Sequence, residues 1–204
     1  RKQLSPGLPA LLRQLSDKGI RFTPASGRQY HNLIQLFPGL EHELLFIAEN
    51  GAMTVDRGKA LFVDEIPLKD LQKPLEITRK AVGVYTVLAG EKTAYCEDDN
   101  PVFRENAEMY YAKLTHVPDL LEAARHDRIC KIAVFEKGNA ERGCYRLLQP
   151  CTERFQVVLS GADWVDLMNP GVNKGHAMRE LQRQLGISPD ECMAFGDYLN
   201  DVEL

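Results

Sequence analysis

The sequence predicts an α/β protein in which a parallel-sheet core is interrupted by a second α/β domain. Strand and helix patterns alternate at both ends of the 204-residue chain. A continuous apolar run at residues 44–48 is typical of a strand buried on both faces of a parallel sheet. In the middle of the chain, residues 68–159, the segments that connect the predicted helices and strands are longer and more polar. The predicted core therefore comprises residues 1–67 and 160–204, and the inserted domain comprises residues 68–159.

The first part of the chain shows a strand, helix, strand order. A helix begins near Ser5, where proline occupies the first turn, and ends near Gly19. A short strand at residues 20–25 and a second helix at residues 29–36 follow, and the apolar run at 44–48 is the next strand. This order predicts a βαβ unit.

A hairpin and then the inserted domain follow the βαβ unit. Residues 52–55 and 60–63 are joined by four residues rich in Asp and Gly, which supply turn conformations. Within the inserted domain we expect helices at 68–82, 101–113 and 138–148 and strands at 83–89, 130–136 and 154–159. We expect the first of these helices to break at Pro74.

The last part of the chain, residues 160–204, again alternates strand and helix patterns as the first part does. It predicts a strand at residues 164–168, a helix from about Lys174 to Leu185 and a strand at residues 192–195. The chain stops at Leu204, inside what the pattern indicates is another helix. We therefore expect the sequence to be incomplete at this end.

Composition argues against several classes of protein. The net charge is −4 with both signs interspersed, which leaves no basic stripe for nucleic acid. Every apolar run is far shorter than the ~20 residues that cross a membrane, and Pro6, Gly7 and Pro9 interrupt any signal-peptide segment. We therefore expect no nucleic-acid or membrane partner.

The cysteines indicate a reducing, cytoplasmic setting. Their number is odd and no Cys-x-x-Cys pair or zinc-ligand spacing occurs. The five are Cys96, Cys130, Cys144, Cys151 and Cys192. We expect all of them to be structural.

The first candidate for chemistry is the turn Ser26, Gly27 and Arg28, placed directly after a predicted strand. Open α/β sheets bind ligands at such strand ends. The serine hydroxyl, a glycine N–H and the start of a helix suit an anion such as phosphate. An ordinary helix cap with a glycine turn explains the same residues.

The second candidate is Lys174, in the first turn of a predicted helix. A cation there opposes the helix dipole at a cost of ~0.3–1 kcal/mol, which a bound anion would offset. A solvated lysine on an exposed face is the alternative.

The third candidate follows the predicted strand 192–195. Asp197, Asn200 and Asp201 place two carboxylates and an amide after the strand, and magnesium takes such oxygen ligands. The spacing lacks the alternating acids of a calcium loop. An Asp cap with a polar first turn is the alternative.

Taken in chain order, these residues resemble the motifs of the haloacid dehalogenase-like phosphohydrolases. Ser26, Gly27 and Arg28 resemble the second motif of that superfamily, Lys174 resembles the third, and residues 196–201 resemble the fourth. The resemblance covers nearly the whole chain. It implies a Rossmann-like parallel-sheet core.

The subfamily resemblance is carried by other segments. Residues 49–52 and 173–175 are similar to the Cof-type subfamily, and residues 48–52 with 163–171 are similar to its bacterial sugar-phosphatase branch. Members of this subfamily carry an α/β cap domain inserted between the second and third motifs. The resemblance therefore implies that residues 68–159 form the cap.

The first motif of the superfamily, an Asp-x-Asp whose leading aspartate accepts the phosphate, does not occur in the sequence. The helix that begins near Ser5 leaves no room for the strand that should carry it. Either the chain is a fragment without its first strand, or the protein has lost the nucleophile. The abrupt end after the fourth motif favours the fragment.

The resemblance implies a mechanism with an aspartyl-phosphate intermediate and Mg²⁺ as cofactor. Asp197 would hold part of the magnesium coordination, and Asp201 would orient Lys174 or the waters of the metal. The implied phosphate-binding residues are Ser26, Gly27, Lys174 and Asn200. Lys174 and Asp201 are thus the catalytic candidates within this chain.

Other polar residues are weaker candidates. Arg28 and Asn50 are candidate substrate contacts, and Arg142 and Ser160 are further possibilities, although each fits a solvated or capping role. His176 fits a surface position on its helix. Trp164 begins an apolar strand and is expected in the core.

The sequence therefore predicts a magnesium-dependent phosphatase of small phosphorylated metabolites, with sugar phosphates as the expected class. A non-catalytic protein that binds or senses a phosphorylated metabolite is the alternative if the nucleophile has been lost. A phosphomutase would keep the enzyme but change the reaction.

Overall fold

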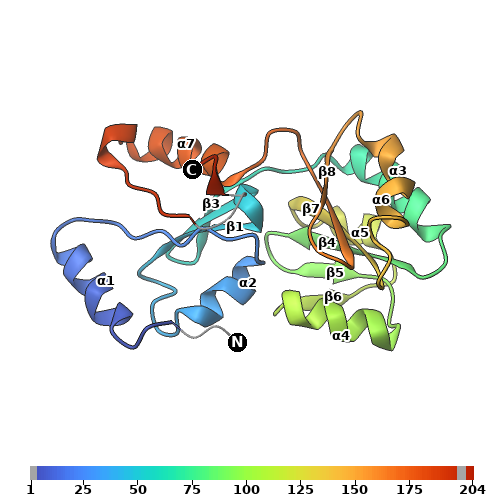
Figure 1. Cartoon of the computed structure of the whole chain (residues 1–204), viewed down its shortest axis with the longest axis horizontal. Coiled ribbons are helices and arrows are strands. Elements are labelled where there is room, and N and C mark those ends of the chain that lie inside the picture. The colour runs from blue at the N-terminus through green and yellow to red at the C-terminus, as the bar shows by residue number, and fades with distance from the viewer. Residues whose placement is uncertain (1–3, 197–200) are drawn as a thin grey trace.

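The computed structural model describes residues 4–196 and 201–204 and shows two lobes, each built on its own β-sheet (Figure 1). We call them the three-stranded lobe and the six-stranded lobe. The predicted α/β fold class is confirmed, and the sheets are mixed or antiparallel in the described residues. Within the described ranges, no helix has the length and apolar character needed to cross a membrane.

The three-stranded lobe has an antiparallel sheet between two layers of helices (Figure 1). The strand order is β1 (Leu45–Ala48), β2 (Met53–Asp56), β3 (Lys59–Val63), and the helices are α1 (Leu8–Asp17), α2 (Tyr30–Leu33), η1 (Ile34–Leu36) and α7 (Lys174–Leu185). Phe46 and Ala48 pack on the side of α1 and α2, and Leu45 and Ile47 pack against α7. The apolar run is therefore buried on both faces, as its composition predicts.

The predicted hairpin is confirmed as β2 and β3. Arg57 and Gly58 turn the chain with φ angles of 50° and 78°. Two successive residues with positive φ are what a tight hairpin requires.

Parallel pairing in this lobe is limited, in the described part of the chain, to one bridge between Ala25 and Ile47. The predicted strand at residues 20–25 is wrong as a full strand. Pro24 has no N–H to donate, so the ladder cannot extend through it. Its carbonyl still accepts from Ile47 N at 2.9 Å, and Ser26 N donates to Ile47 O at 2.9 Å.

The predicted strand at residues 192–195 is also wrong, because residues 192–196 have no regular secondary structure. A strand is held by hydrogen bonds to a neighbour, and Cys192 N instead closes a turn on Pro189 O at 3.0 Å. Met193 and Phe195 are 81% and 85% exposed. The apolar run therefore does not enter a sheet here.

The six-stranded lobe has helices on both faces of its sheet (Figure 1). The strand order is β6 (Leu114–His116), β5 (Ala94–Cys96), β4 (Val84–Gly90), β7 (Ile129–Glu136), β9 (Trp164–Met168), β8 (Gln156–Leu159), with only β5 and β6 parallel among these. The helices are α3 (Leu68–Arg79), α4 (Pro101–Tyr110), α5 (Leu120–Ala124) and α6 (Cys144–Leu147). Residues of α3, α5 and α6 pack on one face, and α4 packs on the other.

Several elements of this lobe differ from the prediction. The helix α3 runs unbroken through Pro74, which is buried. The helix predicted at 138–148 is reduced to α6, because Gly138 and Gly143 adopt non-helical backbone angles. Short 3-10 turns, η3 (Gln149–Cys151) and η4 (Pro189–Glu191), follow α6 and α7.

The boundary predicted between the two domains at residue 160 is wrong. Strand β9 pairs with β7 and β8, so the six-stranded sheet extends to Met168. The sequence of an apolar strand does not show which strand it will pair with. Here β9 hydrogen-bonds to β7, which belongs to the six-stranded sheet. The chain therefore crosses between lobes at residues 64–67 and 169–173.

The two crossings are tied together. Asn169 Nδ2 donates to Asp64 Oδ1 at 2.5 Å and to Glu65 O at 3.0 Å. Arg154 Nη2 donates to Asn169 Oδ1 at 2.9 Å. One amide side chain thus joins both connections to the six-stranded lobe.

Candidate active site

The Ser26, Gly27, Arg28 turn directly follows Ala25, which forms the parallel bridge with Ile47. Arg28 N donates to Ser26 Oγ at 3.2 Å, so the hydroxyl oxygen accepts within its own turn. The hydroxyl hydrogen can then be donated to an anionic oxygen. Arg28 itself donates from Nη1 to Asn32 Oδ1 at 3.2 Å.

The 3-10 turn η2 (Glu49–Gly51) lies against this loop. Glu49 N donates to Arg28 O at 3.0 Å, and Asn50 N donates to Ser26 O at 3.1 Å. A Cβ on Gly27 would lie 2.7 Å from Asn50 Oδ1. A side chain at residue 27 would therefore displace the Asn50 side chain from its present position.

The same turn also contacts the start of α7. Gly51 has a φ of +98°, and a Cβ there would lie 2.1 Å from Asn173 O and 3.0 Å from Lys174 N. Asn173 caps the helix, since its Oδ1 accepts from His176 N at 2.7 Å. Residues Asn50 and Gly51 thus contact the Ser26 loop on one side and the helix start at Lys174 on the other.

Lys174 is buried and paired. Its residue exposure is 5%, which contradicts the alternative of a solvated surface lysine. The ammonium forms an ion pair with Asp201, whose side chain is 13% exposed. A buried ammonium beside a carboxylate at a helix start is a preorganised charge that can face an anion.

Two predicted site residues, Asp197 and Asn200, lie outside the described residues. Among residues 4–196 and 201–204, no group of three His, Cys, Asp or Glu side chains is arranged to hold a metal ion. Asp201 is engaged by Lys174. The magnesium prediction therefore rests on Asp197.

The weaker candidates lie on the surface or in the core of the protein. Arg142 and Ser160 are exposed in the six-stranded lobe. His176 Nε2 lies 3.6 Å from Asp64 Oδ2 and its side chain is 34% exposed. Trp164 is buried against Phe135, with ring centroids 5.0 Å apart.

The cysteines fit the structural role expected of them. Cys96, Cys130, Cys144 and Cys151 are buried free thiols, and Cys192 is half-buried. Burial, together with the nearby Glu136 carboxylate, raises the pKa of Cys144 to about 12. A thiol with this pKa is a poor nucleophile near neutral pH.

Sequence reasoning missed a buried ionic cluster near the site, formed by Glu49, Lys131 and Asp166. Lys131 Nζ lies 2.5 Å from Glu49 Oε2 and 3.9 Å from Asp166 Oδ2. Lys131 stands between Cys130 and Ile132 in the apolar strand β7. A lone charge inside an apolar strand was the signal available in the sequence.

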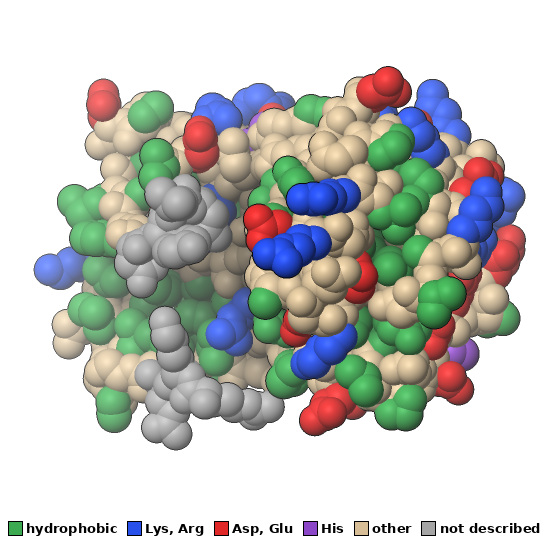
Figure 2. Space-filling model, turned by 45° about the vertical axis from the view of Figure 1, so that its right-hand side comes forward, with side chains coloured by type: hydrophobic (Ala, Val, Ile, Leu, Met, Phe, Trp, Pro, Cys, Tyr) green, Lys and Arg blue, Asp and Glu red, His purple; other side chains and the backbone are tan. Residues whose placement is uncertain are grey.

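Outside these residues, a pocket of about 510 Å³ opens in the six-stranded lobe near the first crossing. It is lined by Glu65, Leu68, Glu91, Lys92, Ala124, Arg125, His126, Asp127 and Arg128. None of these is a predicted site residue. A separate recess is visible between the two lobes (Figure 2).

The whole chain, residues 1–204, matches the family model of the haloacid dehalogenase-like hydrolases. The chain belongs to this family. Curated relatives of this haloacid dehalogenase-like hydrolase include 5-amino-6-(5-phospho-D-ribitylamino)uracil phosphatase YbjI of Escherichia coli K12. The two are 33% identical over 201 residues, which is 96% of this chain and 72% of the relative.

Another curated relative of this haloacid dehalogenase-like hydrolase is the HMP-PP phosphatase of Cronobacter sakazakii. It is 24% identical over 216 residues, covering 99% of this chain and 74% of the relative. Both relatives are named as phosphatases.

Solved structures show the same fold. A protein from Eubacterium rectale superposes with a TM-score of 0.85 at 27% identity, over 98% of this chain and 77% of that one. TM0651 from Thermotoga maritima gives a TM-score of 0.86 at 20% identity, over 98% and 76%. The haloacid dehalogenase-like fold is therefore shared across both lobes.

Proposed function

We propose that this haloacid dehalogenase-like hydrolase is a magnesium-dependent phosphatase that hydrolyses small phosphorylated metabolites, sugar phosphates in particular. The observation that carries the proposal is the convergence at Asn50 and Gly51. There Asn50 contacts the Ser26 turn, and the next residue, Gly51, lies against the backbone of Asn173 and Lys174. A hydroxyl, a glycine N–H and a buried ammonium on the segments that flank η2 are donors suited to a phosphoryl group.

The residues of this chain have distinct roles in the proposed reaction. The Ser26 hydroxyl and the Gly27 N–H hold one phosphoryl oxygen, and Lys174 neutralises another. Asp201 holds the Lys174 ammonium in position through their ion pair. Asn200 contributes a further phosphate contact.

Magnesium fits the donor chemistry, because carboxylate oxygens are the ligands that it prefers. We assign Asp197 to the metal, since Asp201 is engaged by Lys174. When bound, the ion would neutralise charge on the phosphoryl oxygens.

The attacking carboxylate is the part of the mechanism that these residues do not supply. The sequence has no Asp-x-Asp, and we place the nucleophile outside the 204 residues. It would form an aspartyl-phosphate and release the alcohol, and water would then free inorganic phosphate.

The substrate class is supported by the relative with 33% identity. Its name specifies a substrate with the phosphate on a D-ribityl chain, a sugar-derived polyol. We therefore favour phosphate esters of sugars or sugar alcohols.

The test is phosphate release from hexose and pentitol phosphates by the protein extended to include an Asp-x-Asp, with and without magnesium. We expect turnover with magnesium and its loss in EDTA. Full activity in EDTA would refute the metal-assisted mechanism. The 204-residue chain itself is expected to bind inorganic phosphate but to release none from esters.

The absence of an Asp-x-Asp also favours one second candidate, a phosphometabolite-binding or regulatory protein without catalysis. This candidate predicts phosphate-ester binding and no turnover even in the extended protein. The same assay distinguishes the two.

A further inference from the structure

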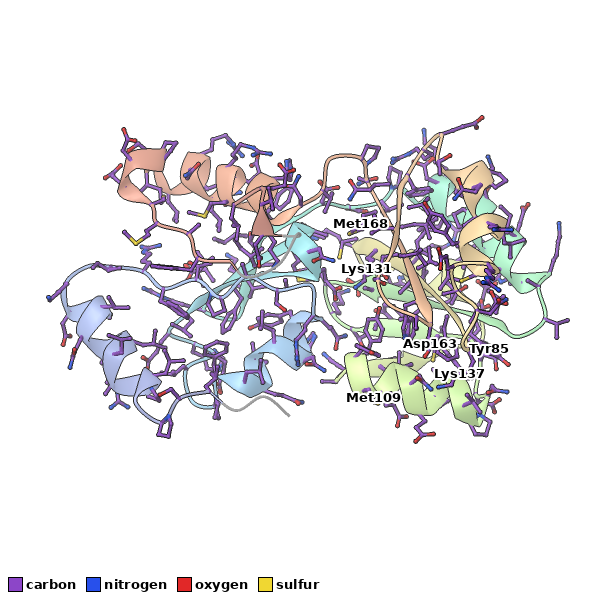
Figure 3. All side chains as sticks on the ribbon, in the orientation of Figure 1. Tyr85, Met109, Lys131, Lys137, Asp163 and Met168 are labelled. Carbon is purple, nitrogen blue, oxygen red and sulfur yellow. The ribbon has the colours of Figure 1, made fainter. Side chains whose placement is uncertain are left out.

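The ionic cluster of Glu49, Lys131 and Asp166 spans the boundary between the lobes. Lys131 lies on β7 and Asp166 on β9, both in the six-stranded sheet, whereas Glu49 belongs to η2 of the other lobe. Their side chains are 5%, 8% and 0% exposed respectively. Figure 3 labels Lys131 at the side of the six-stranded lobe that faces the three-stranded lobe.

Lys131 is the charge on which the cluster depends. Burial alone would lower its pKa, but the carboxylates of Asp166 and Glu49 outweigh burial and raise the pKa of Lys131 well above its usual value. Its ammonium also lies 5.6 Å from the centre of the buried Tyr111 ring. Lys131 is therefore charged and enclosed on several sides.

Glu49 depends on that charge. Its Oε1 is buried and has no hydrogen-bond partner among the described residues, while its Oε2 lies beside Lys131. A buried carboxylate is costly unless it is paired. The lysine thus fixes where the Glu49 side chain can lie.

The backbone at Glu49 has an unusual conformation. Glu49, Asn50 and Gly51 have φ angles of 50°, 56° and 98°. Left-handed angles at two successive residues with side chains persist only where the surroundings hold them. The ion pair with Lys131 is one such anchor.

The anchored turn η2 contacts both halves of the proposed phosphate site. Glu49 and Asn50 donate their N–H groups to the carbonyls of Arg28 and Ser26, and Gly51 lies against Asn173. A change in the conformation of η2 would move the Ser26 turn relative to Lys174. Apolar replacement of a buried ion pair is often as stable as the pair itself, so stability alone does not account for these charges.

We propose that Lys131 is a positioning residue, which holds Glu49 and thereby sets the Ser26 turn and the Lys174 helix start at the separation that binds phosphate. The proposal rests on the proposed function. It means that the six-stranded lobe contributes to phosphate binding through a residue that does not touch the phosphate.

The experiment compares Lys131→Met, Lys131→Arg and a control, Lys137→Met. Lys137 is an exposed lysine just beyond β7 that pairs with Asp163 at 3.8 Å. Two properties are measured on the 204-residue chain: its affinity for inorganic phosphate by calorimetry, and hydrogen exchange of the Glu49 and Asn50 amides without phosphate.

We expect Lys131→Met to weaken phosphate binding by about tenfold or more, the size of the effect of losing a well-placed ionic contact, and to speed exchange at both amides. Lys131→Arg should retain most of the affinity, because it keeps the charge. Lys137→Met should match the wild type. Wild-type affinity and exchange in a folded Lys131→Met variant would overturn the proposal.

A double variant covers the case in which Lys131→Met does not fold. Glu49→Gln with Lys131→Met removes both charges and with them the unpaired carboxylate. If the double variant folds but binds phosphate weakly, the proposal is supported. If it binds as the wild type does, or also fails to fold, the cluster is structural and the proposal is wrong.

The two proposals can fail separately. A wild-type chain that does not bind inorganic phosphate would contradict the phosphate site itself. The exchange measurement would still show whether Lys131 holds η2, because it needs no ligand.

Discussion

The position of Lys174 at a helix start can be predicted from the sequence, but its burial and its ion pair cannot. The sequence places it at a helix start, where the dipole argument predicts a small effect on stability. The structure adds burial and an ion pair with Asp201, neither of which is visible in the local pattern. Lys131 is the opposite case: its apolar neighbours mark it in the sequence, but its partner Glu49 is distant along the chain and could not be inferred.

Lys174→Gln is therefore expected to destabilise the protein by about 1–3 kcal/mol, because it leaves the Asp201 carboxylate without its cation. Denaturant unfolding measures this change. Phosphate affinity should fall by about tenfold or more, since a preorganised charge is lost. Adding Asp201→Asn should restore stability but not affinity, and restoration of both would return Lys174 to a structural role.

At the scale of the element, the sequence predicted the strands that are buried along almost their whole length. Strands β1 and β7 were predicted because they are almost entirely buried and their sequences are continuously apolar. Strands β5 and β6 and helix α5 were missed because three to five residues carry too little periodicity. Strand β9 was predicted as a strand but assigned to the wrong lobe, since pairing is set by the fold.

Helix α5 offers a pH-dependent test. Asp119 caps it, and hydrogen bonds from Glu122 N and Leu121 N, aided by Arg79, lower the pKa of Asp119. A carboxylate with a lowered pKa stabilises the folded state above its unfolded pKa, and this contribution is lost as pH falls through the folded pKa.

Asp119→Asn keeps a capping oxygen but removes the charge. We expect its melting temperature to lie below that of the wild type near neutral pH and to converge with it as the pH falls below about 4, the usual range for an aspartate. Thermal melts across this range measure the difference. A gap that stayed constant with pH would show that the Asp119 charge has no role in capping.

At the scale of the whole molecule, the lobes are joined by more than the two crossings. Gln29, which is buried, donates from Nε2 to Lys113 O at 2.8 Å and accepts from Lys113 N at 3.1 Å. This amide pairs with the backbone of the other lobe as a neighbouring strand would. Gln29 is the residue after the Ser26 turn, so this contact between lobes is adjacent in sequence to the proposed phosphate site.

Gln29→Leu should cost about 1–3 kcal/mol, because the Lys113 N–H loses its acceptor. The Lys113 carbonyl loses one donor but still accepts from Ala94 N and Thr93 Oγ1. Urea unfolding measures the loss, and hydrogen exchange should rise at Lys113. Asn32→Ala is the control, since Asn32 donates to Met109 O from an exposed position at 3.3 Å. Equal losses in the two variants would argue against a special role for the buried contact.

The discontinuity of the three-stranded lobe has a consequence for biosynthesis. A ribosome releases the Ser26 turn and β1 early, then the contiguous stretch that forms the six-stranded sheet, and only afterwards Lys174 and α7. The six-stranded lobe can therefore fold while the nascent chain is still growing, as domains generally do. The two halves of the proposed phosphate site come together only after the returning segment emerges, because the six-stranded lobe separates them in the sequence.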